Sequence, residues 1–286
     1  MTDKRILIVA NELSARLDEP GLVVLDCRFD LGDPAAGRRS FLERHIAGAR
    51  FIDLDDDLAG PVSARTGRHP LPDADTIAAR LGRLGVDNAS RIVVYDGSSG
   101  AMAARAWWIL RWLGHDEVRL LDGGFARWQT LGLPVDTGES QSAATRFEPR
   151  LRPELVLTTQ ELAGDLEGIG KRRLLDARDR ARYRGEMEPV DAVAGHVPGA
   201  VNLPFTEFLN EDGSWRSREE RARRMRDVLG DDPAVPWSVM CGSGVTACHL
   251  AIAGLEAGYG EPRVYVGSWS EWIRDPERPV GLGDAV

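Results

Sequence analysis

The chain has 286 residues, of which 43% are hydrophobic and 28% charged, and its formal net charge at pH 7 is −9. This length suits one large domain or two of ordinary size, and either half could bury a hydrophobic core. The negative charge argues against nucleic acid or an anionic membrane as a partner, because both would repel the chain as a whole. The longest apolar stretches have about ten residues, which is too short to span a bilayer.

The N-terminal residues and the cysteines indicate the compartment. Met1–Arg5 lead into a short apolar run that Asn11 and Glu12 interrupt, and this pattern is too short and too soon polar for a signal peptide. The chain contains three cysteines, Cys27, Cys241 and Cys248. An odd number argues against a disulfide framework. We therefore expect a reducing, cytoplasmic location.

An internal repeat organises the sequence. Four segments of the first half recur in the second half in the same order, each about 150 residues later. The pairs are Leu25–Arg28 with Leu175–Arg178, His45–Ala49 with His196–Ala200, Val93–Ser98 with Ser238–Ser243, and Asp122–Trp128 with Val266–Trp272. We infer that the chain holds two copies of one domain.

Each copy has the pattern of an α/β domain. Short runs rich in β-branched residues, such as Val23–Leu25, Ile92–Tyr95 and Val118–Leu121, alternate with helical stretches such as Ala101–Leu113. Such runs, bounded by Gly and Asp and separated by helices, predict a parallel sheet flanked by helices.

The join between the copies is predicted within Leu133–Pro153, which is rich in Ser, Thr, Gly and Pro and has little periodicity. We therefore predict a first domain over residues 1–140, a linker over 141–155 and a second domain over 156–286.

The repeat helps to separate scaffold from chemistry, because a residue present in both copies serves the fold. His45 and His196 form such a pair, and so do the segments that contain Asp26 with Arg28 and Asp176 with Arg178. We predict structural roles for all of them. A residue that differs between the copies is a candidate for a site.

The most informative difference is Asp96 in the first copy and Cys241 in the second. Both follow a hydrophobic strand and precede a helix, so both are expected at the carboxyl edge of a sheet, where α/β proteins bind ligands. Gly242 and Gly244 let the backbone curl so that successive N–H groups point inward, and the following helix adds the partial positive charge of its N-terminus. Such surroundings favour a thiolate at neutral pH. Cys27 and Cys248 are predicted to be core thiols.

The string Cys241–Ala247 resembles the active-site loop of the mercaptopyruvate sulfurtransferases, a branch of the rhodanese family. The segments Gly195–Ala200 and Gly267–Trp272 and a first copy without the cysteine extend the resemblance over nearly the whole chain. It implies two tandem rhodanese-like domains, the first inactive and the second catalytic. It also implies an enzyme that takes sulfur from a small-molecule donor as a persulfide on Cys241 and passes it to cyanide or a thiol.

The resemblance also implies roles for individual residues. Arg182 falls where the family keeps an arginine for the substrate anion, and a planar guanidinium suits a carboxylate or sulfonate. Ser243 resembles the serine of a relay, Asp55 resembles its acid, and His69 lies where some members have a histidine. The predicted catalytic residues are Cys241, Ser243, Asp55 and His69, and the predicted substrate-binding residues are Arg182, Gly242, Gly244, Val245 and Thr246.

Three rival functions fit less well. A cysteine phosphatase of the cell-cycle type shares this domain design but places an arginine six positions after the cysteine, where this chain has Ala247. A non-catalytic binding module would fit the copy with Asp96 but not the copy with Cys241. A serine hydrolase would need Gly-x-Ser-x-Gly, which neither loop contains.

The sulfur donor is the finer choice. Residues 242–247 carry no charge, whereas the thiosulfate-using branch tends to carry Arg and Lys in this loop. This favours 3-mercaptopyruvate, with thiosulfate as the alternative. One departure counts against it, because the mercaptopyruvate branch usually has a second arginine after a Glu-Pro pair, and Glu188-Pro189 is followed here by Val190. No metal or organic cofactor is predicted, since no group of His, Cys and acidic residues has ligand spacing.

Overall fold

The computed structural model describes residues 5–164, 166 and 173–284, and it divides into two compact units. Unit 1 consists of Met1–Gly60, Leu71–Arg152 and Leu209–Trp215, and unit 2 of Pro61–Pro70, Pro153–Phe208 and Arg216–Val286. Each unit therefore includes one short segment from the opposite half of the sequence. Within the described ranges, none of the helices combines the length and the apolar character needed to cross a bilayer.

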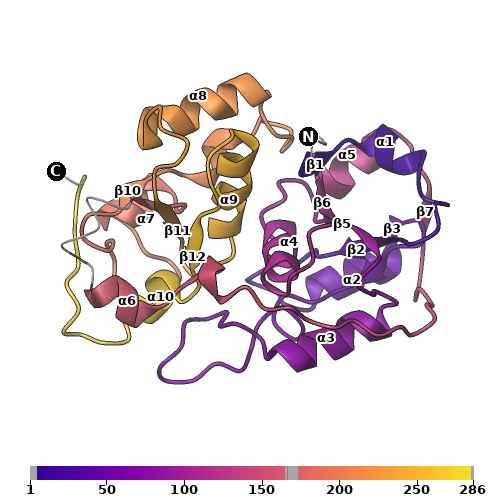
Figure 1. The fold of residues 1–286 in the computed structure, drawn as a ribbon, viewed down its shortest axis with the longest axis horizontal. Coiled ribbons are helices and arrows are strands. Elements are labelled where there is room, and N and C mark those ends of the chain that lie inside the picture. The colour runs from indigo at the N-terminus through magenta and orange to yellow at the C-terminus, as the bar shows by residue number, and fades with distance from the viewer. Residues whose placement is uncertain (1–4, 165, 167–172, 285–286) are drawn as a thin grey trace. The chain divides into compact units, whose positions relative to one another are not determined.

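Unit 1 is built on a parallel five-stranded sheet (Figure 1). Its strands lie in the order β1 (Leu7–Ile8), β6 (Val118–Leu121), β5 (Arg91–Tyr95), β2 (Leu22–Asp26) and β4 (Arg50–Phe51). Its helices are α1 (Ala10–Ser14), α2 (Ala36–Glu43), α3 (Ala74–Arg83), α4 (Ala103–Trp112) and α5 (Gly124–Thr130). The strands β3 (His45–Ile46) and β7 (Val135–Asp136) form a separate antiparallel pair.

Unit 2 repeats this topology. Its parallel strands lie in the order β8 (Val156–Leu157), β12 (Arg263–Tyr265), β11 (Trp237–Met240), β9 (Arg173–Asp176) and β10 (Val201–Asn202). Its helices are α6 (Thr159–Gly164), α7 (Arg180–Arg184), α8 (Arg218–Leu229), α9 (Ala247–Glu256) and α10 (Ser268–Trp272). The predicted fold, two tandem α/β domains with parallel sheets flanked by helices, is confirmed.

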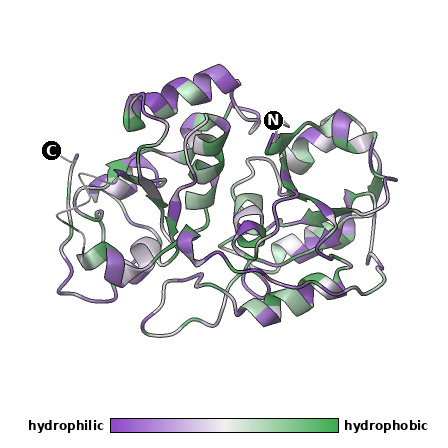
Figure 2. Ribbon diagram, viewed as in Figure 1, coloured by the Kyte–Doolittle hydropathy of each residue, from purple (hydrophilic) through white to green (hydrophobic). Residues whose placement is uncertain are grey.

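Both faces of each sheet are covered, which explains why the strands read as continuous apolar runs. In unit 1, Val24 and Val93 share a core cluster with residues of α1 and α5, while Val23, Leu25 and Val94, which alternate with them, are also buried. α4 contacts β5 and β6. α4 and α9 are mostly hydrophobic, whereas α8 is largely hydrophilic (Figure 2).

The repeated residues make matching contacts in the two units. His45 stacks on Phe41 with ring centroids 3.9 Å apart, and His196 stacks on Tyr183 at the same distance. Each histidine Nδ1 also lies within hydrogen-bond distance of its stacking partner's backbone oxygen. The guanidiniums of Arg28 and Arg178 donate to the carboxylates of Asp26 and Asp176, respectively, at the carboxyl ends of β2 and β9. These contacts serve the fold.

The segment Leu133–Pro153 belongs to unit 1 as far as Arg152. Besides forming β7, it donates from the backbone N–H of Thr145 to the oxygen of Gly82 and from that of Arg150 to Leu113, both at 2.8 Å. Besides these backbone hydrogen bonds, Leu133 packs against the core cluster of unit 1 and Phe147 is buried beside His115. These apolar residues are too few and too far apart to give the segment a periodic hydrophobic pattern.

Candidate active site

Cys241 directly follows β11, the central strand of the unit 2 sheet, as Asp96 follows β5 in unit 1. The start of α10 holds the backbone of this loop, because Trp269 N–H donates to the Cys241 oxygen at 3.0 Å and Ser270 N–H to the Gly242 oxygen at 2.9 Å. In unit 1, α5 makes the same two bonds to the Asp96 loop, both at 2.8 Å. The backbone that positions the thiol is thus part of the repeated scaffold.

The thiol lies inside a curled loop. Cys241 is 2% exposed, and its Sγ accepts a hydrogen bond from Gly244 N–H at 3.2 Å. Gly244 has φ +77°, and a Cβ there would lie 2.4 Å from the backbone oxygen of Val266, so only glycine fits this turn. The N-terminal end of α9 follows at Ala247 and directs its partial positive charge toward the loop. The Gly244 amide and the helix N-terminus both direct partial positive charge toward Sγ.

The corresponding loop of unit 1 holds an anion of its own. The buried carboxylate of Asp96 accepts hydrogen bonds from the N–H groups of Ser98, Gly100, Met102 and Ala103, at 3.0, 2.9, 2.8 and 3.2 Å. Burial raises the pKa of Asp96, and the four amides oppose that shift. The loop of unit 2 is one residue shorter, because Gly100 and Gly244 share a positive φ and α4 and α9 begin at Ala103 and Ala247. The equivalent amides of unit 2 therefore belong to Ser243, Gly244, Thr246 and Ala247. This backbone can therefore cradle a negative group.

Ser268 has a strained backbone and binds the backbone of Cys241, a contact that the sequence did not reveal. It is the one non-glycine residue with positive φ among those described, at +52°, and Gly124 occupies the equivalent position of unit 1 at +51°. Its Oγ accepts from Cys241 N–H at 3.1 Å and donates to the Tyr265 oxygen at 2.8 Å. Strain of this kind persists where the surroundings enforce it, commonly at functional sites.

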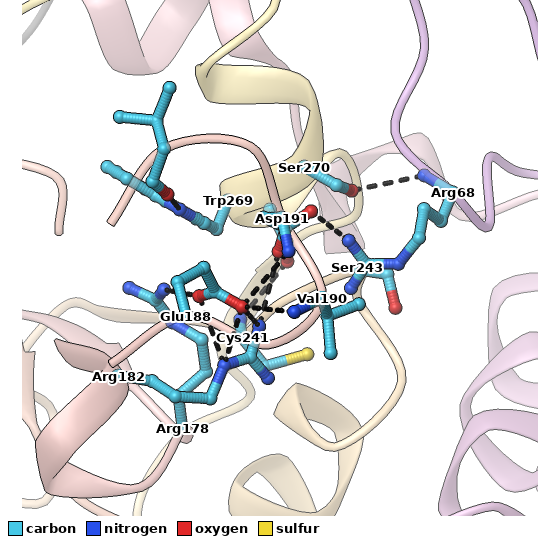
Figure 3. A network of polar contacts seen from close by, with 12 residues as sticks. Arg68, Arg178, Arg182, Glu188, Val190, Asp191, Cys241, Ser243, Trp269 and Ser270 are labelled. Carbon is cyan, nitrogen blue, oxygen red and sulfur yellow. Dashed lines mark hydrogen bonds and ion pairs between the residues drawn. The ribbon is translucent and has the colours of Figure 1, made fainter. Parts of the chain in front are cut away.

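Arg182 lies in a network of charges beside the loop (Figure 3). Asp179 caps the short helix α7, and Arg182 reaches from this helix to Glu188 at 2.7 Å and Asp191 at 3.2 Å. Burial by itself would raise the pKa of Glu188, but the hydrogen bond from Arg182 and the amides of Asp191 and Val190 hold it below its usual value. Burial and the nearby Glu188 raise the pKa of Asp191, against the pull of Arg68 and Arg182.

Two more predicted residues meet within unit 2. His69 is 5% exposed, and its Nδ1 lies 2.7 Å from Ser243 Oγ, although 174 positions separate them in the chain. Asp55 belongs to unit 1, where burial raises its pKa, followed by the charges of Asp53 and Asp56. Its assignment as the acid of the relay stays a prediction.

The remaining predicted loop residues are buried or half-buried. Gly242 and Val245 are buried, and Thr246 is half-buried at the position just before α9. The other two cysteines lie in the core, and all three are free thiols. Burial, with the charges of Asp26 and Asp96, raises the pKa of Cys27 well above its ordinary value, which disfavours a reactive thiolate there. Cys248 lies within α9, with Sγ 3.3 Å from the Gly244 oxygen.

Sequence reasoning missed Arg68, Glu188, Asp191 and Ser268 as members of this site. The Arg68 guanidinium pairs with Asp191, and its backbone N–H donates to Ser270 Oγ at 3.0 Å. The sequence around Arg68 does not predict these contacts, because Asp191 and Ser270 lie more than a hundred positions away in the chain. For Ser268, the signal was the exchange of Gly124 for serine between the two copies.

Comparisons with known proteins agree with this architecture. The family model of the rhodanese-like domain matches residues 9–131 and again 158–275. A protein of Pseudomonas aeruginosa named "Probable 3-mercaptopyruvate sulfurtransferase" is 48% identical over 97% of this chain and 98% of its own. The thiosulfate sulfurtransferase of Gallus gallus is 40% identical over 88% of this chain and 86% of its own.

Among solved structures, the crystal structure of SseA from Escherichia coli, a 3-mercaptopyruvate sulfotransferase, superposes with a TM-score of 0.82. It is 30% identical and covers 93% of this chain and 99% of that one. The two matches to the domain model, the extent of these similarities and the shared loop lead to one conclusion: this chain belongs to the rhodanese family, as one of its tandem-domain sulfurtransferases.

Proposed function

We propose that this chain moves sulfane sulfur from 3-mercaptopyruvate to cyanide or a thiol acceptor through a persulfide on Cys241. The observation that carries the proposal is the position of Cys241 Sγ inside the curled loop, with Gly244 N–H directed at it and guanidinium groups beside the adjacent Gly242. A small anionic donor suits such surroundings, because amides stabilise the sulfur anion and guanidiniums bind a carboxylate.

The first half-reaction loads the enzyme. The Cys241 thiolate attacks the sulfur of 3-mercaptopyruvate, so that an S–S bond forms as the C–S bond of the donor breaks. The electron pair of that bond passes to C3 as the enolate of pyruvate, which takes up a proton and leaves as pyruvate. The amide of Gly244 donates to Cys241 Sγ, and we expect it and the amides of Ser243, Thr246 and Ala247, which correspond to those around Asp96, to stabilise the negative outer sulfur.

The second half-reaction unloads it. Cyanide attacks the outer sulfur, the S–S bond breaks, its electron pair returns to Cys241 as the thiolate, and thiocyanate leaves. A thiolate acceptor would take the sulfur in the same way, giving its own persulfide.

The two halves of the chain contribute unequally in this proposal. Residues 156–286 form the catalytic domain after a linker at 141–155, and residues 1–140 form a copy that carries no sulfur, since the Asp96 carboxylate already accepts the loop amides. Arg68 and His69 come from the first half of the sequence and contact the cysteine loop within unit 2, because Pro61–Pro70 belongs to that unit.

The donor is tested by steady-state rates with 3-mercaptopyruvate and thiosulfate, measured on one preparation with cyanide as acceptor. We expect a higher kcat/KM with 3-mercaptopyruvate, because residues 242–247 carry no charge and the guanidiniums lie beside the loop, where they can hold the carboxylate of a monoanion. Thiosulfate is the alternative, and relatives named for either donor resemble this chain. A clear preference for thiosulfate would show that thiosulfate is the donor, and Cys241 would remain the proposed sulfur carrier.

Ser243 and His69 are proposed to deliver the proton that the enolate takes up, with Asp55 as the supporting acid. Ser243→Ala and His69→Asn should each lower kcat by about 2- to 10-fold, the equivalent of losing one hydrogen bond worth about 0.5–1.5 kcal/mol. The double variant should be no slower than the slower single variant, because the two residues act through one contact.

Ser98→Ala, at the equivalent position of unit 1, is the matched control and should leave kcat unchanged. Decreases that multiply in the double variant would argue against a shared role for Ser243 and His69.

A further inference from the structure

Arg68 is held beside the cysteine loop by the same helix that anchors that loop. Its backbone N–H donates to Ser270 Oγ at 3.0 Å, and the neighbouring Gly67 N–H donates to Glu271 at 3.3 Å. A Cβ at Gly67 would lie 2.5 Å from the Gly267 oxygen, so this close approach requires glycine. The backbone of Arg68 is therefore fixed relative to α10, whose first turn bonds Cys241 and Gly242.

The side chain of Arg68 reaches the point where Arg182 also ends. A Cβ built on Gly242 would lie 3.0 Å from Nη2 of Arg68, and 3.5 and 3.6 Å from Nη2 and Nη1 of Arg182. Gly242 is not among the glycines with positive φ, so its backbone does not require glycine. The missing side chain instead leaves room for two guanidiniums next to the residue that follows Cys241.

The hydrogen bonds of the two arginines leave specific donors on the loop side. Asp191 accepts from Nη1 of Arg68 and from Nη2 of Arg182, and Glu188 accepts from Nε and Nη2 of Arg182 (Figure 3). Nη2 of Arg68 and Nη1 of Arg182 have no hydrogen-bond partner among the described residues. Within the same part of the chain, Nε of Arg68 is buried without a partner, which is uncommon for a polar group in a folded protein.

The bridging carboxylate explains how two cations can lie so close. Two guanidiniums near one point repel each other, and Asp191, whose side chain is 5% exposed, offsets that repulsion by binding both. It also fixes their orientation, because it binds Nη1 of Arg68 and Nη2 of Arg182 and so leaves Nη2 of Arg68 and Nη1 of Arg182 available as donors near Gly242. Asp191 thus acts as a positioning residue for the pair.

We propose that Arg68 is a second substrate-binding cation. Nη2 of Arg68 and Nη1 of Arg182 together bind the carboxylate of a 2-oxo-3-thiol acid while the sulfur of this donor contacts Cys241. The inference deepens the proposed function and rests on it. Arg68 thereby replaces the arginine that the family resemblance places after Glu188-Pro189, where this chain has the 40% exposed Val190.

The test compares Arg68→Ala and Arg68→Lys with the wild type in steady-state assays with 3-mercaptopyruvate and cyanide. Arg65→Ala is the matched control, because it removes the same charge from an exposed residue of the same segment. We expect Arg68→Ala to raise KM by roughly tenfold with kcat within about twofold, Arg68→Lys to recover part of this, and Arg65→Ala to match the wild type.

A second measurement isolates the step in which the carboxylate takes part. Arg68→Ala should also weaken product inhibition by pyruvate by roughly tenfold, since pyruvate keeps the carboxylate. The persulfide form of Arg68→Ala should react with cyanide at the wild-type rate, because cyanide has no carboxylate for Arg68 to bind. Equal melting temperatures would show that the segment remains folded.

The outcomes separate the inference from the function on which it rests. If the wild type fails to use 3-mercaptopyruvate, the proposed donor is wrong and the inference falls with it. If the wild type uses it, but Arg68→Ala keeps the wild-type KM and pyruvate inhibition, the inference alone is overturned.

Discussion

Cys241→Ser is expected to abolish sulfur transfer while the chain remains folded. A serine hydroxyl in this loop cannot form the S–S bond that stores the transferred sulfur, so no loaded intermediate accumulates. The direct measurement is mass spectrometry after incubation with donor alone. The wild type should gain one sulfur atom, located on a peptide that contains Cys241, and Cys241→Ser should gain none.

Two kinds of control belong to this experiment. Cys27→Ser and Cys248→Ser should stay largely active, because both thiols are core residues distinct from the carrier. Cys241→Asp copies the arrangement of unit 1, in which the Asp96 carboxylate accepts four loop amides, and should therefore be inactive but folded. Full activity in Cys241→Ser would contradict the proposed function.

Arg182→Ala is expected to raise KM for 3-mercaptopyruvate by about 10- to 100-fold. A charge-assisted contact between a guanidinium and a carboxylate contributes about 1.5–3 kcal/mol, which corresponds to that range. Arg182→Lys should restore only part of the affinity, because an ammonium cannot reproduce the planar fork. Steady-state kinetics over a wide range of donor concentrations separates KM from kcat.

The control for this prediction is Arg180→Ala, which removes an exposed arginine of the same helix that pairs with Glu207. Arg182→Ala also removes a main partner of Glu188, whose side chain is 3% exposed, so the free energy of unfolding should be measured in parallel. A wild type that prefers thiosulfate and is indifferent to Arg182→Ala would overturn both the donor and the anion site. Sulfur carriage by Cys241 would survive that result.

Much of the fold could be predicted, because the hydrophobic pattern of its strands and helices is local and recurs in both halves of the sequence. Apolar runs and the helices between them predict strands and crossovers, and the repeat shows that one set of local rules operates in both units. The same comparison separates the paired residues His45 and His196, which make equivalent stacking contacts, from the exchange of Asp96 for Cys241. That Cys241 follows a strand could be predicted from the hydrophobic pattern, whereas the central place of that strand in the sheet is decided by the tertiary topology.

The sequence by itself therefore determined the tandem α/β fold, the cysteine loop and one candidate cation, Arg182. Only the tertiary structure brought Arg68 to Gly242, joined Asp191 to both guanidiniums and placed His69 on Ser243. The physical reason is that these contacts join segments distant in the chain, and no local pattern encodes the return of Pro61–Pro70 to unit 2. A comparison with the family motif along the sequence finds Val190 where an arginine is usual. The binding of an anion depends on where a guanidinium lies in space, so an arginine from a distant segment, such as Arg68, can take this role.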